Sequence, residues 1–141
     1  MTWRLNKTVL PQDTDHAGVM WHGSYLNWLE ESRIDALSKI GLSYADLSLS
    51  GYEMPVVEIK IKYISPLHHG NHVLVESWAL PQKGVKFPWK TIFFKDDGIP
   101  AAEAMVYLVL VRRLQSNIRL LRKSPDHLSN AFSKLIKGSI D

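Results

Sequence analysis

The segment at residues 24–40 constrains the fold most, because it predicts a helix that is apolar almost all round in its first turns. Residues 25–29 (Tyr-Leu-Asn-Trp-Leu) contain no charged side chain. A helix that lies on a protein surface normally keeps a wide polar face. We therefore expect this helix to be enclosed by other structure. Ser24 is the expected N-cap, and Gly41 follows the last apolar residue as a C-terminal stop.

After residue 54 the spacing of the apolar residues changes to two, which predicts β-strands. Residues such as Val57 and Ile59 share one face of the first of these strands, and charged residues alternate with them up to Pro66. Turn residues separate the strands that follow. Further strands are expected at residues 3–9, 72–80, 85–95 and 101–113. Four long strands with short turns between them predict an antiparallel meander.

Two further helices complete the expected order of elements. A short helix is expected at residues 43–49, and a terminal helix at 125–137 with Ser124 as its N-cap and Pro125 at its first position. The resulting fold class is α+β, with a long antiparallel sheet curled around the enclosed helix. The length of 141 residues fits a single domain over residues 1–141.

The composition excludes several classes of protein. The chain has no cysteine, which removes disulfides and thiolate metal sites and fits a reducing cytoplasm. The longest apolar run, residues 104–111, is far shorter than the roughly 20 residues that cross a bilayer. No signal peptide is recognisable either, so we expect a soluble cytoplasmic protein with no membrane partner. Because that run is apolar on both faces of a strand, we expect a helix on one side of it and a partner chain on the other.

The formal net charge of +3 suits a polyanionic ligand, either coenzyme A or a nucleic acid. The basic residues are dispersed, however, and the five tryptophans do not alternate with them as they do on surfaces that bind nucleic acids. Nucleic acid is therefore not an expected partner. The six histidines lack the spacing typical of a metal site, so neither a metal nor a cofactor is expected.

The loop before the enclosed helix carries the candidate chemistry. Asp13 and Asp15 are followed by Gly18, which permits a sharp turn, and then by the start of the helix. A helix N-terminus offers unpaired N–H groups that carry partial positive charge. A carboxylate beside such donors can attack a carbonyl, or direct a water onto it, while the donors polarise the carbonyl oxygen. The alternative is that both aspartates are ordinary turn or capping residues, and the bare pattern favours that interpretation.

A longer motif favours the catalytic interpretation over the turn interpretation. Residues 13–25 (DTDHAGVMWHGSY), followed by Glu30 and Arg33, resemble the signature of the hotdog-fold thioesterases. The similarity is closest to the 4-hydroxybenzoyl-CoA thioesterase family and to the acyl-CoA thioesterases associated with the bacterial Tol–Pal system. The resemblance implies a hotdog fold, a homodimer or homotetramer of such units, and hydrolysis of an acyl-CoA thioester.

The resemblance also implies roles for individual residues. Asp15 matches the catalytic carboxylate, and the backbone N–H groups at His22 and Gly23 match the donors that polarise the thioester carbonyl. Asp13 matches a supporting position. The residues expected around the acyl group are Asp13, Gly18, Val19, Trp21, Tyr25 and Glu30.

The expected partner of the site is an acyl-CoA substrate. Three lysines are expected to meet the phosphates of coenzyme A: Lys83, Lys86 and Lys90. The resemblance extends to the thioesterases that release 1,4-dihydroxy-2-naphthoate, which implies a 1,4-dihydroxy-2-naphthoyl group as one candidate. An aromatic acyl group, such as this one or benzoyl, is favoured over a short aliphatic chain because the surroundings of the expected site are rich in aromatic residues. These residues are Trp21, Tyr25, Trp28, Phe87 and Trp89.

Two other functions remain open from the sequence. A hotdog hydratase would pair a histidine with a carboxylate on the helix, for which His22 and Glu30 are the candidates, but the loop lacks the His-Phe-Pro pattern of those enzymes. A non-catalytic module would bind acyl-CoA in the same place without turnover. Thioester hydrolysis is the leading interpretation, and it makes Asp15 essential.

Overall fold

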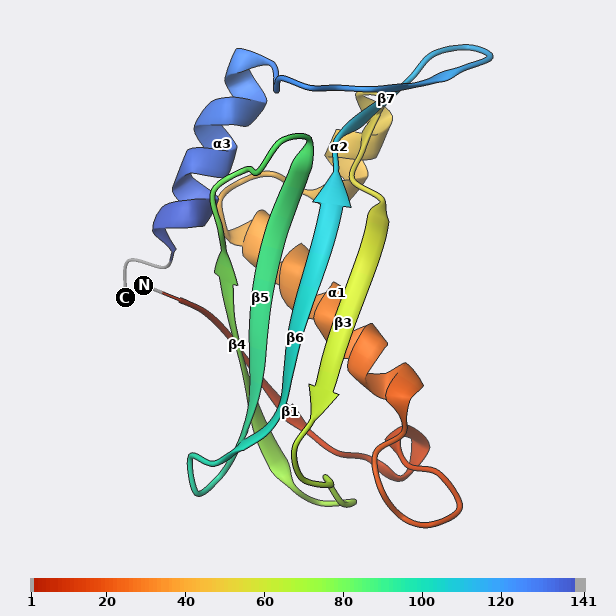
Figure 1. The fold of residues 1–141 in the computed structure, drawn as a ribbon, viewed down its shortest axis with the longest axis vertical. Helices are drawn as coiled ribbons and strands as arrows, with labels where there is room; N and C mark the ends of the chain where they lie inside the picture. Colours follow the sequence, from red (N-terminus) through yellow and green to blue (C-terminus); the bar gives the residue numbers. More distant parts are fainter. Residues whose placement is uncertain (1, 139–141) are drawn as a thin grey trace.

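The computed structural model describes residues 2–138, which form a curved antiparallel sheet around one long helix (Figure 1). The elements follow the chain in this order: β1 (Trp3–Thr8), the 3₁₀ turn η1 (Pro11–Asp13), α1 (His22–Lys39), α2 (Tyr44–Leu49), β2 (Tyr52–Glu53), β3 (Val56–Tyr63), β4 (His72–Ala79), β5 (Lys86–Lys95), β6 (Pro100–Val109), β7 (Val111–Arg113), β8 (Ile118–Leu120) and α3 (Asp126–Lys137). The predicted α+β class is confirmed.

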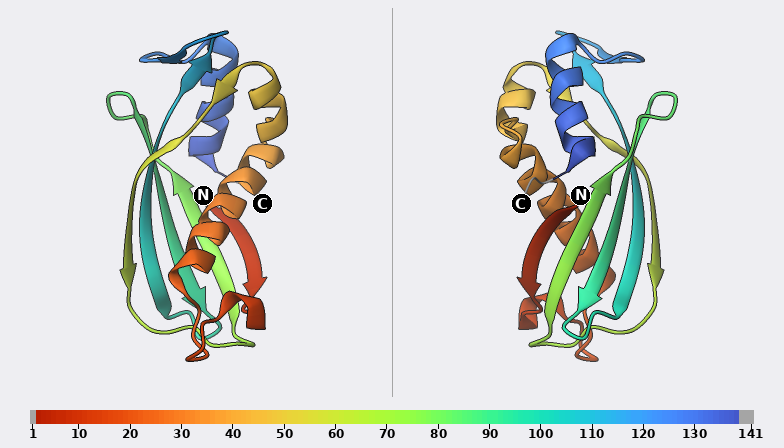
Figure 2. Two further views of the ribbon diagram at one scale, coloured as in Figure 1. Left: turned by 90° about the vertical axis from the view of Figure 1, so that its right-hand side faces the viewer. Right: turned by 90° about the vertical axis from the view of Figure 1, so that its left-hand side faces the viewer.

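The large sheet has the strand order β1-β4-β5-β6-β3, and every neighbouring pair is antiparallel. α1 runs along the concave side of this sheet, and the two side views show the strands curving around it (Figure 2). α3 covers the upper end of the same side (Figure 1). The sheet therefore encloses one face of α1 along the length of the helix. No helix among residues 2–138 is long and apolar enough to cross a membrane.

The predicted four-stranded meander is wrong at its first strand. β4, β5 and β6 follow one another in the sheet, but β3 pairs with β6 at the edge and not with β4. The segment at residues 64–71 carries the chain across the end of the sheet. It is bonded to the start of β6 by the N–H groups of Ile64 and Ser65, which reach Ala101 O, and to Val9 by Gly70 N–H. A turn signal in the sequence marks where a strand ends, not which strand becomes its neighbour.

The strand predicted at residues 101–113 is divided at Leu110. β6 ends at Val109, and β7 belongs to a second sheet of order β2-β7-β8. Leu110 is fully buried in a separate apolar cluster that also contains Leu47 and Phe132. A run that is apolar at every position gives no sign of the residue at which it leaves one core for another, so the division could not be predicted.

Two helix starts also differ from the prediction. α1 begins at His22 with Trp21 as its N-cap, and Ser24 lies inside the first turn. The Ser24 hydroxyl is buried and donates to Asp13 O over 3.1 Å, so it joins the helix to the preceding loop and caps nothing. In α3 the N-cap is Pro125, one residue later than the predicted Ser124.

Phe93 on β5 lies at the centre of the contact between α1 and the sheet. Its side chain is completely buried, and its ring packs edge-on against Tyr25 at 5.2 Å between centroids and lies nearly parallel to Trp28 at 6.5 Å. Such aromatic pairs stabilise a core beyond the apolar area that they bury. Next to them, the hydroxyl groups of Ser32, Ser77 and Thr91 form a buried chain from α1 to β4 and β5, with oxygen separations of 3.4 and 3.0 Å. Aromatic packing and hydrogen bonds thus both hold α1 against the sheet.

The position of Phe93 predicts a large loss of stability when its ring is removed. Phe93→Ala should lower the free energy of unfolding by about 3–5 kcal/mol, because it leaves a cavity between α1 and the sheet. Urea denaturation followed by circular dichroism measures this loss. The matched control is Phe94→Ala, since Phe94 is only half-buried and should cost clearly less. Equal losses for the two variants would contradict the central place given to Phe93.

Candidate active site

The loop at residues 13–21 and the first turn of α1 form one hydrogen-bonded unit. Thr14 pairs with Met20 in an antiparallel bridge, and Asp13 O accepts the N–H of Trp21 over 3.1 Å. Met20 N–H in turn donates to Leu67 O over 2.7 Å, which holds the loop against the segment that crosses the end of the sheet. Asp15 therefore lies on a short hairpin whose two ends are fixed to the start of the helix.

Asp13 stabilises the loop and the first turn of α1 through hydrogen bonds. Its Oδ2 accepts the backbone N–H of Leu10 over 2.9 Å, and its main-chain oxygen accepts both Trp21 N–H and the Ser24 hydroxyl. The side chain is half-buried and already has hydrogen-bond partners. This geometry suits a residue that positions the loop.

Asp15 is exposed, and its two carboxylate oxygens differ. Oδ1 accepts the backbone N–H groups of Ala17 over 2.8 Å and of Val19 over 3.4 Å, whereas Oδ2 has no hydrogen bond to any residue in 2–138. Gly18 closes the turn with a φ of 82°, a backbone conformation that residues with a side chain rarely adopt. Asp15 is thus a turn residue through one oxygen, and its other oxygen remains available for chemistry. The two interpretations of the motif are compatible.

The first turn of α1 supplies unpaired donors next to this loop. Trp21 provides no side-chain cap, and the backbone N–H groups of His22 and Gly23 bond to no acceptor in the described part of the chain. The indole of Trp21 lies directly over Gly23, because a Cβ placed on Gly23 would fall 2.2 Å from the ring. Trp21 is 41% exposed, and the His22 ring meets it edge-on at 5.1 Å. Gly23 thus leaves room for the aromatic ring beside the first turn of α1.

Not all predicted site residues are brought together. The hairpin unit contains Asp13, Asp15, Gly18, Val19, Trp21, His22 and Gly23. Tyr25 points instead into the core, where it is 2% exposed and contacts Phe93 and Tyr63. Glu30 lies two turns further along α1, at the rim of a separate cavity.

The three lysines expected to bind coenzyme A lie far from the hairpin within one chain. The turn that carries Lys83 joins β4 to β5 at the upper end of the sheet, whereas the hairpin lies at the lower end (Figure 1). Lys86 and Lys90 lie on the outer face of β5, where they sit over the rings of Tyr107 and Trp78. A single chain therefore does not bring these lysines to Asp15, and their expected role would require a second subunit.

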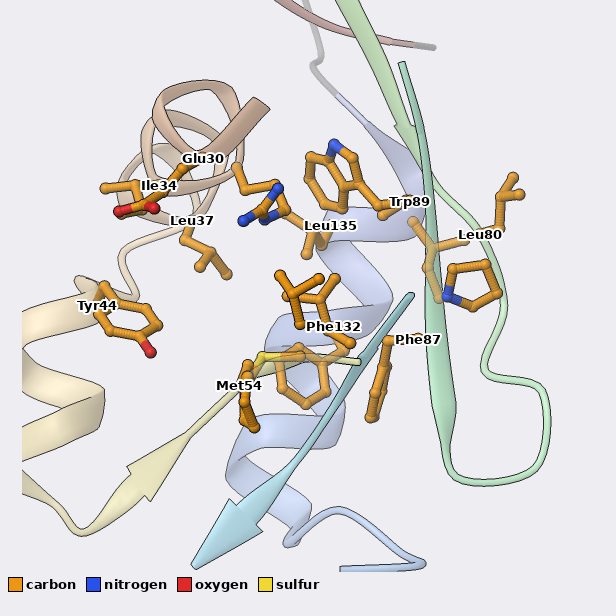
Figure 3. A pocket seen from close by; sticks show the side chains of 17 residues that line it. Glu30, Ile34, Leu37, Tyr44, Met54, Leu80, Phe87, Trp89, Phe132 and Leu135 are labelled. Carbon is orange, nitrogen blue, oxygen red and sulfur yellow. The ribbon is translucent and has the colours of Figure 1, made fainter. Parts of the chain in front are cut away.

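A cavity of about 280 Å³ lies between the second half of α1, the sheet and α3 (Figure 3). Arg33 is its one basic residue, and burial lowers the pKa of this guanidinium below its usual range, while Glu30 and Tyr44 oppose the shift. Arg33 is not among the predicted site residues, and in the sequence it stands out as part of the family motif. An arginine beside the apolar Ile34 and Leu37 of a helix predicted to be enclosed was the signal that could have drawn attention to this site.

Among residues 2–138, no group of three or more His, Asp or Glu side chains is placed to hold a metal ion. The hairpin itself offers a carboxylate and main-chain N–H donors.

A sheet wrapped around a helix, with a carboxylate-bearing hairpin at the helix N-terminus, is the arrangement of the hotdog fold. The chain belongs to the thioesterase-like superfamily, whose sequence model matches residues 9–132. This membership confirms the fold and the enzyme class predicted from the motif.

Three known proteins are similar to the chain, each over a different share of its length. A Synechocystis protein named as a candidate esterase is 30% identical over 128 residues, which cover 90% of this chain and 76% of that one. A 1,4-dihydroxy-2-naphthoyl-CoA hydrolase of Thermosynechococcus vestitus is 34% identical over 70 residues, covering 49% of this chain and 48% of the relative. The solved structure of a DHNA-CoA thioesterase from Staphylococcus aureus superposes with a TM-score of 0.84 at 25% identity, covering 94% of this chain and 89% of that one.

The environment of Tyr25 predicts a pH dependence of stability. Burial, with a smaller contribution from Tyr63, raises the pKa of the Tyr25 phenol to about 12, whereas the phenol of an unfolded chain titrates near about 10. The folded state holds this proton more tightly, so the contribution of Tyr25 to stability is complete below about pH 10 and is lost as the pH rises towards about 12. Between these pH values Tyr25→Phe should lose less stability than the unmodified protein. Urea denaturation at stepwise pH measures the difference, and parallel curves would contradict the assignment.

Proposed function

We propose that the chain hydrolyses an acyl-CoA thioester between Asp15 and the N-terminus of α1. The observation that carries the proposal is the state of the Asp15 carboxylate. One oxygen is anchored by the N–H groups of Ala17 and Val19, and the other bonds to no residue among 2–138. It belongs to the same hydrogen-bonded unit as the N–H groups of His22 and Gly23, which have no acceptor among those residues either. A nucleophile or base and an oxyanion site are what acyl transfer needs.

The proposed reaction has two variants that share one geometry. In the first, Asp15 Oδ2 takes a proton from a water whose oxygen bonds to the thioester carbon. In the second, Oδ2 itself bonds to that carbon, and water cleaves the resulting anhydride. In both, the negative charge that develops on the carbonyl oxygen faces the N–H groups at His22 and Gly23, and collapse expels the thiolate of coenzyme A. A thiolate leaves readily, so no general acid is required.

The proposed working unit is a homo-oligomer, a dimer or a tetramer. β3 lies at the edge of the sheet, and its apolar side chains are unusually exposed in a single chain, with Val57 and Tyr63 each 52% exposed. Exposed apolar edge strands favour pairing with another chain. A second subunit on this edge would also be the source of residues, including basic ones, that a single chain does not bring to Asp15.

The proposed acyl group is aromatic, such as benzoyl or 1,4-dihydroxy-2-naphthoyl, with a short aliphatic chain as the alternative. Two similar proteins are named for the naphthoyl substrate. Of the five aromatic residues that suggested this preference, Tyr25, Trp28 and Trp89 are core residues. The support from the structure is therefore Trp21, whose exposed ring over Gly23 offers a stacking surface beside the donors.

The Asp15→Asn variant tests the catalytic role. Asparagine can still accept the N–H groups of Ala17 and Val19, so the hairpin should remain folded while the charge is lost. The kcat for release of coenzyme A, measured with a thiol reagent, should fall by about 10²–10⁴-fold.

The matched control is Asp97→Asn. Asp97 also accepts a nearby backbone N–H, that of Ile99 over 3.0 Å, at the exposed turn between β5 and β6. This variant should hydrolyse as the unmodified protein does. Near-normal turnover by Asp15→Asn would refute the proposal, and tight acyl-CoA binding by the unmodified protein without turnover would favour the non-catalytic module.

A panel of thioesters tests the acyl preference. The kcat/KM for benzoyl-CoA or 1,4-dihydroxy-2-naphthoyl-CoA should exceed that for hexanoyl-CoA by at least about tenfold, and Trp21→Ala should reduce this ratio because it removes the stacking surface. Trp78→Ala, on the outer face of the sheet, is the tryptophan control and should leave the ratio unchanged. Equal rates on all three substrates would exclude an aromatic preference.

A further inference from the structure

The positive charge of the chain is concentrated in one two-stranded arm. This basic arm, residues 111–123, contains β7 and β8 and projects past the upper end of β3 in Figure 1. It holds five of the 17 Lys and Arg residues of the chain and none of the 14 Asp and Glu residues. That leaves 12 basic and 14 acidic residues elsewhere, a net charge of −2, so the arm accounts for the whole formal charge of +3. Such a concentration of charge favours an anionic partner.

Three of the five basic side chains in the arm are exposed and have no carboxylate within ion-pair distance and no aromatic ring beneath them among residues 2–138. They are Arg119, Arg122 and Lys123. The other two have partners within the chain, since Arg112 lies over the ring of Tyr52 and Arg113 pairs with Glu53. The charge that remains available therefore lies on β8 and directly after it.

The backbone of β8 has an open edge. β8 is the last strand of the sheet β2-β7-β8, and Leu121 N–H, just after it, donates to Leu110 O over 2.9 Å. Hydrogen-bonded positions alternate along an antiparallel pair, so the backbone of Arg119 faces β7, and the N–H and C=O groups of Ile118 and Leu120 point away from it. An edge of this kind is a template for a further strand.

The side chains of β8 separate by face in the same way. Ile118 and Leu120 lie on one face and are 68% and 46% exposed, whereas Arg119 lies on the other face, opposite Arg112 of β7. A strand added at the open edge would place its own alternate side chains beside these two sets. The face of Ile118 and Leu120 suits apolar side chains, and the face of Arg119 suits acidic ones.

These features distinguish among anionic partners. The hydrocarbon of a bilayer offers no partner for the open N–H and C=O groups of the edge. A nucleic acid would find no aromatic residue in the arm on which its bases could stack. A second copy of the chain is opposed by repulsion between two arms that each carry five positive charges. A protein segment in extended conformation satisfies the backbone groups, the apolar face and the charge together.

We propose that the open edge of β8 binds an extended, acidic segment of a partner protein by β-strand addition. The main chain of the segment pairs with the N–H and C=O groups of Ile118 and Leu120, its apolar residues lie beside these two side chains, and its acidic residues lie beside Arg119. The arm is at the upper end of the molecule and the hairpin that carries Asp15 is at the lower end (Figure 1). The proposal goes beyond the proposed function and does not depend on it.

A fluorescein-labelled peptide of alternating valine and glutamate tests the proposal by fluorescence polarisation. It should bind the unmodified protein with a Kd below about 100 μM. A valine–lysine peptide of the same length should bind at least about tenfold more weakly because its charge is reversed. The valine–glutamate peptide with every backbone nitrogen methylated should also bind at least about tenfold more weakly, because it keeps the charge but cannot donate main-chain hydrogen bonds.

Variants of β8 separate backbone pairing from charge. Leu120→Pro removes an outward N–H at an edge position where proline is tolerated, and it should weaken binding of the valine–glutamate peptide by at least about tenfold. Leu120→Val keeps that donor and should bind as the unmodified protein does. Arg119→Gln should weaken binding severalfold, and it decides the question if Leu120→Pro does not fold. Its matched control is Arg4→Gln, an exposed arginine of β1, which should leave the affinity unchanged.

Four outcomes would overturn the proposal. The first two are no binding of the valine–glutamate peptide to the unmodified protein and equal binding of its methylated form. The third is displacement of the peptide by phosphatidylglycerol vesicles, an oligonucleotide or coenzyme A, which would assign the charge of the arm to another anion. The fourth is a smaller oligomer for Leu120→Pro in sedimentation velocity, which would assign the edge to a second copy of the chain.

Discussion

The packing of α1 into the concave side of the sheet, centred on Phe93, is the contact on which the rest of the structure depends. The rings of Tyr25 and Trp28 meet Phe93 there, and the buried hydroxyl chain through Ser32 fixes the helix against β4 and β5. Once the helix axis is fixed, the position of its first turn is fixed too. Asp13 then ties the loop to that turn, and the hairpin beyond it presents Asp15 beside the donors at His22 and Gly23. A rigid core thus positions the exposed carboxylate that we propose to be catalytic.

Much of this arrangement could be predicted from the sequence, because its signals are local. The charge-free start of the helix predicted its enclosure, alternation predicted the strands, and the motif at residues 13–25 predicted the loop at the helix N-terminus. The predictions that were wrong concern contacts between segments that are distant in the sequence. The pairing of β3 with β6 is set by the segment at residues 64–71, and the division at Leu110 by a second apolar cluster.

For the candidate site, too, local features could be predicted from the sequence, and features that depend on distant contacts could not. The sequence distinguished Asp15 from Asp13, and the hydrogen bonds now give each aspartate a separate geometry. Other predicted site residues lie outside the hairpin. Tyr25 turned into the core because helical periodicity places it on the buried face with Trp28, and the basic residues on β5 lie on its outer face because strand residues alternate sides. The cavity that Arg33 lines depends on α3, which comes from a distant part of the chain.

We propose that Asp15 and the α1 N-terminus act on the same carbonyl group. A crystal structure with a non-hydrolysable ketone analogue of benzoyl-CoA tests it most directly. The ketone oxygen should lie about 2.7–3.1 Å from the backbone nitrogen of His22 or Gly23, with Asp15 Oδ2 facing the carbonyl carbon directly or through one water. A ketone group bound away from the α1 N-terminus, or with Asp15 turned away from it, would contradict the account.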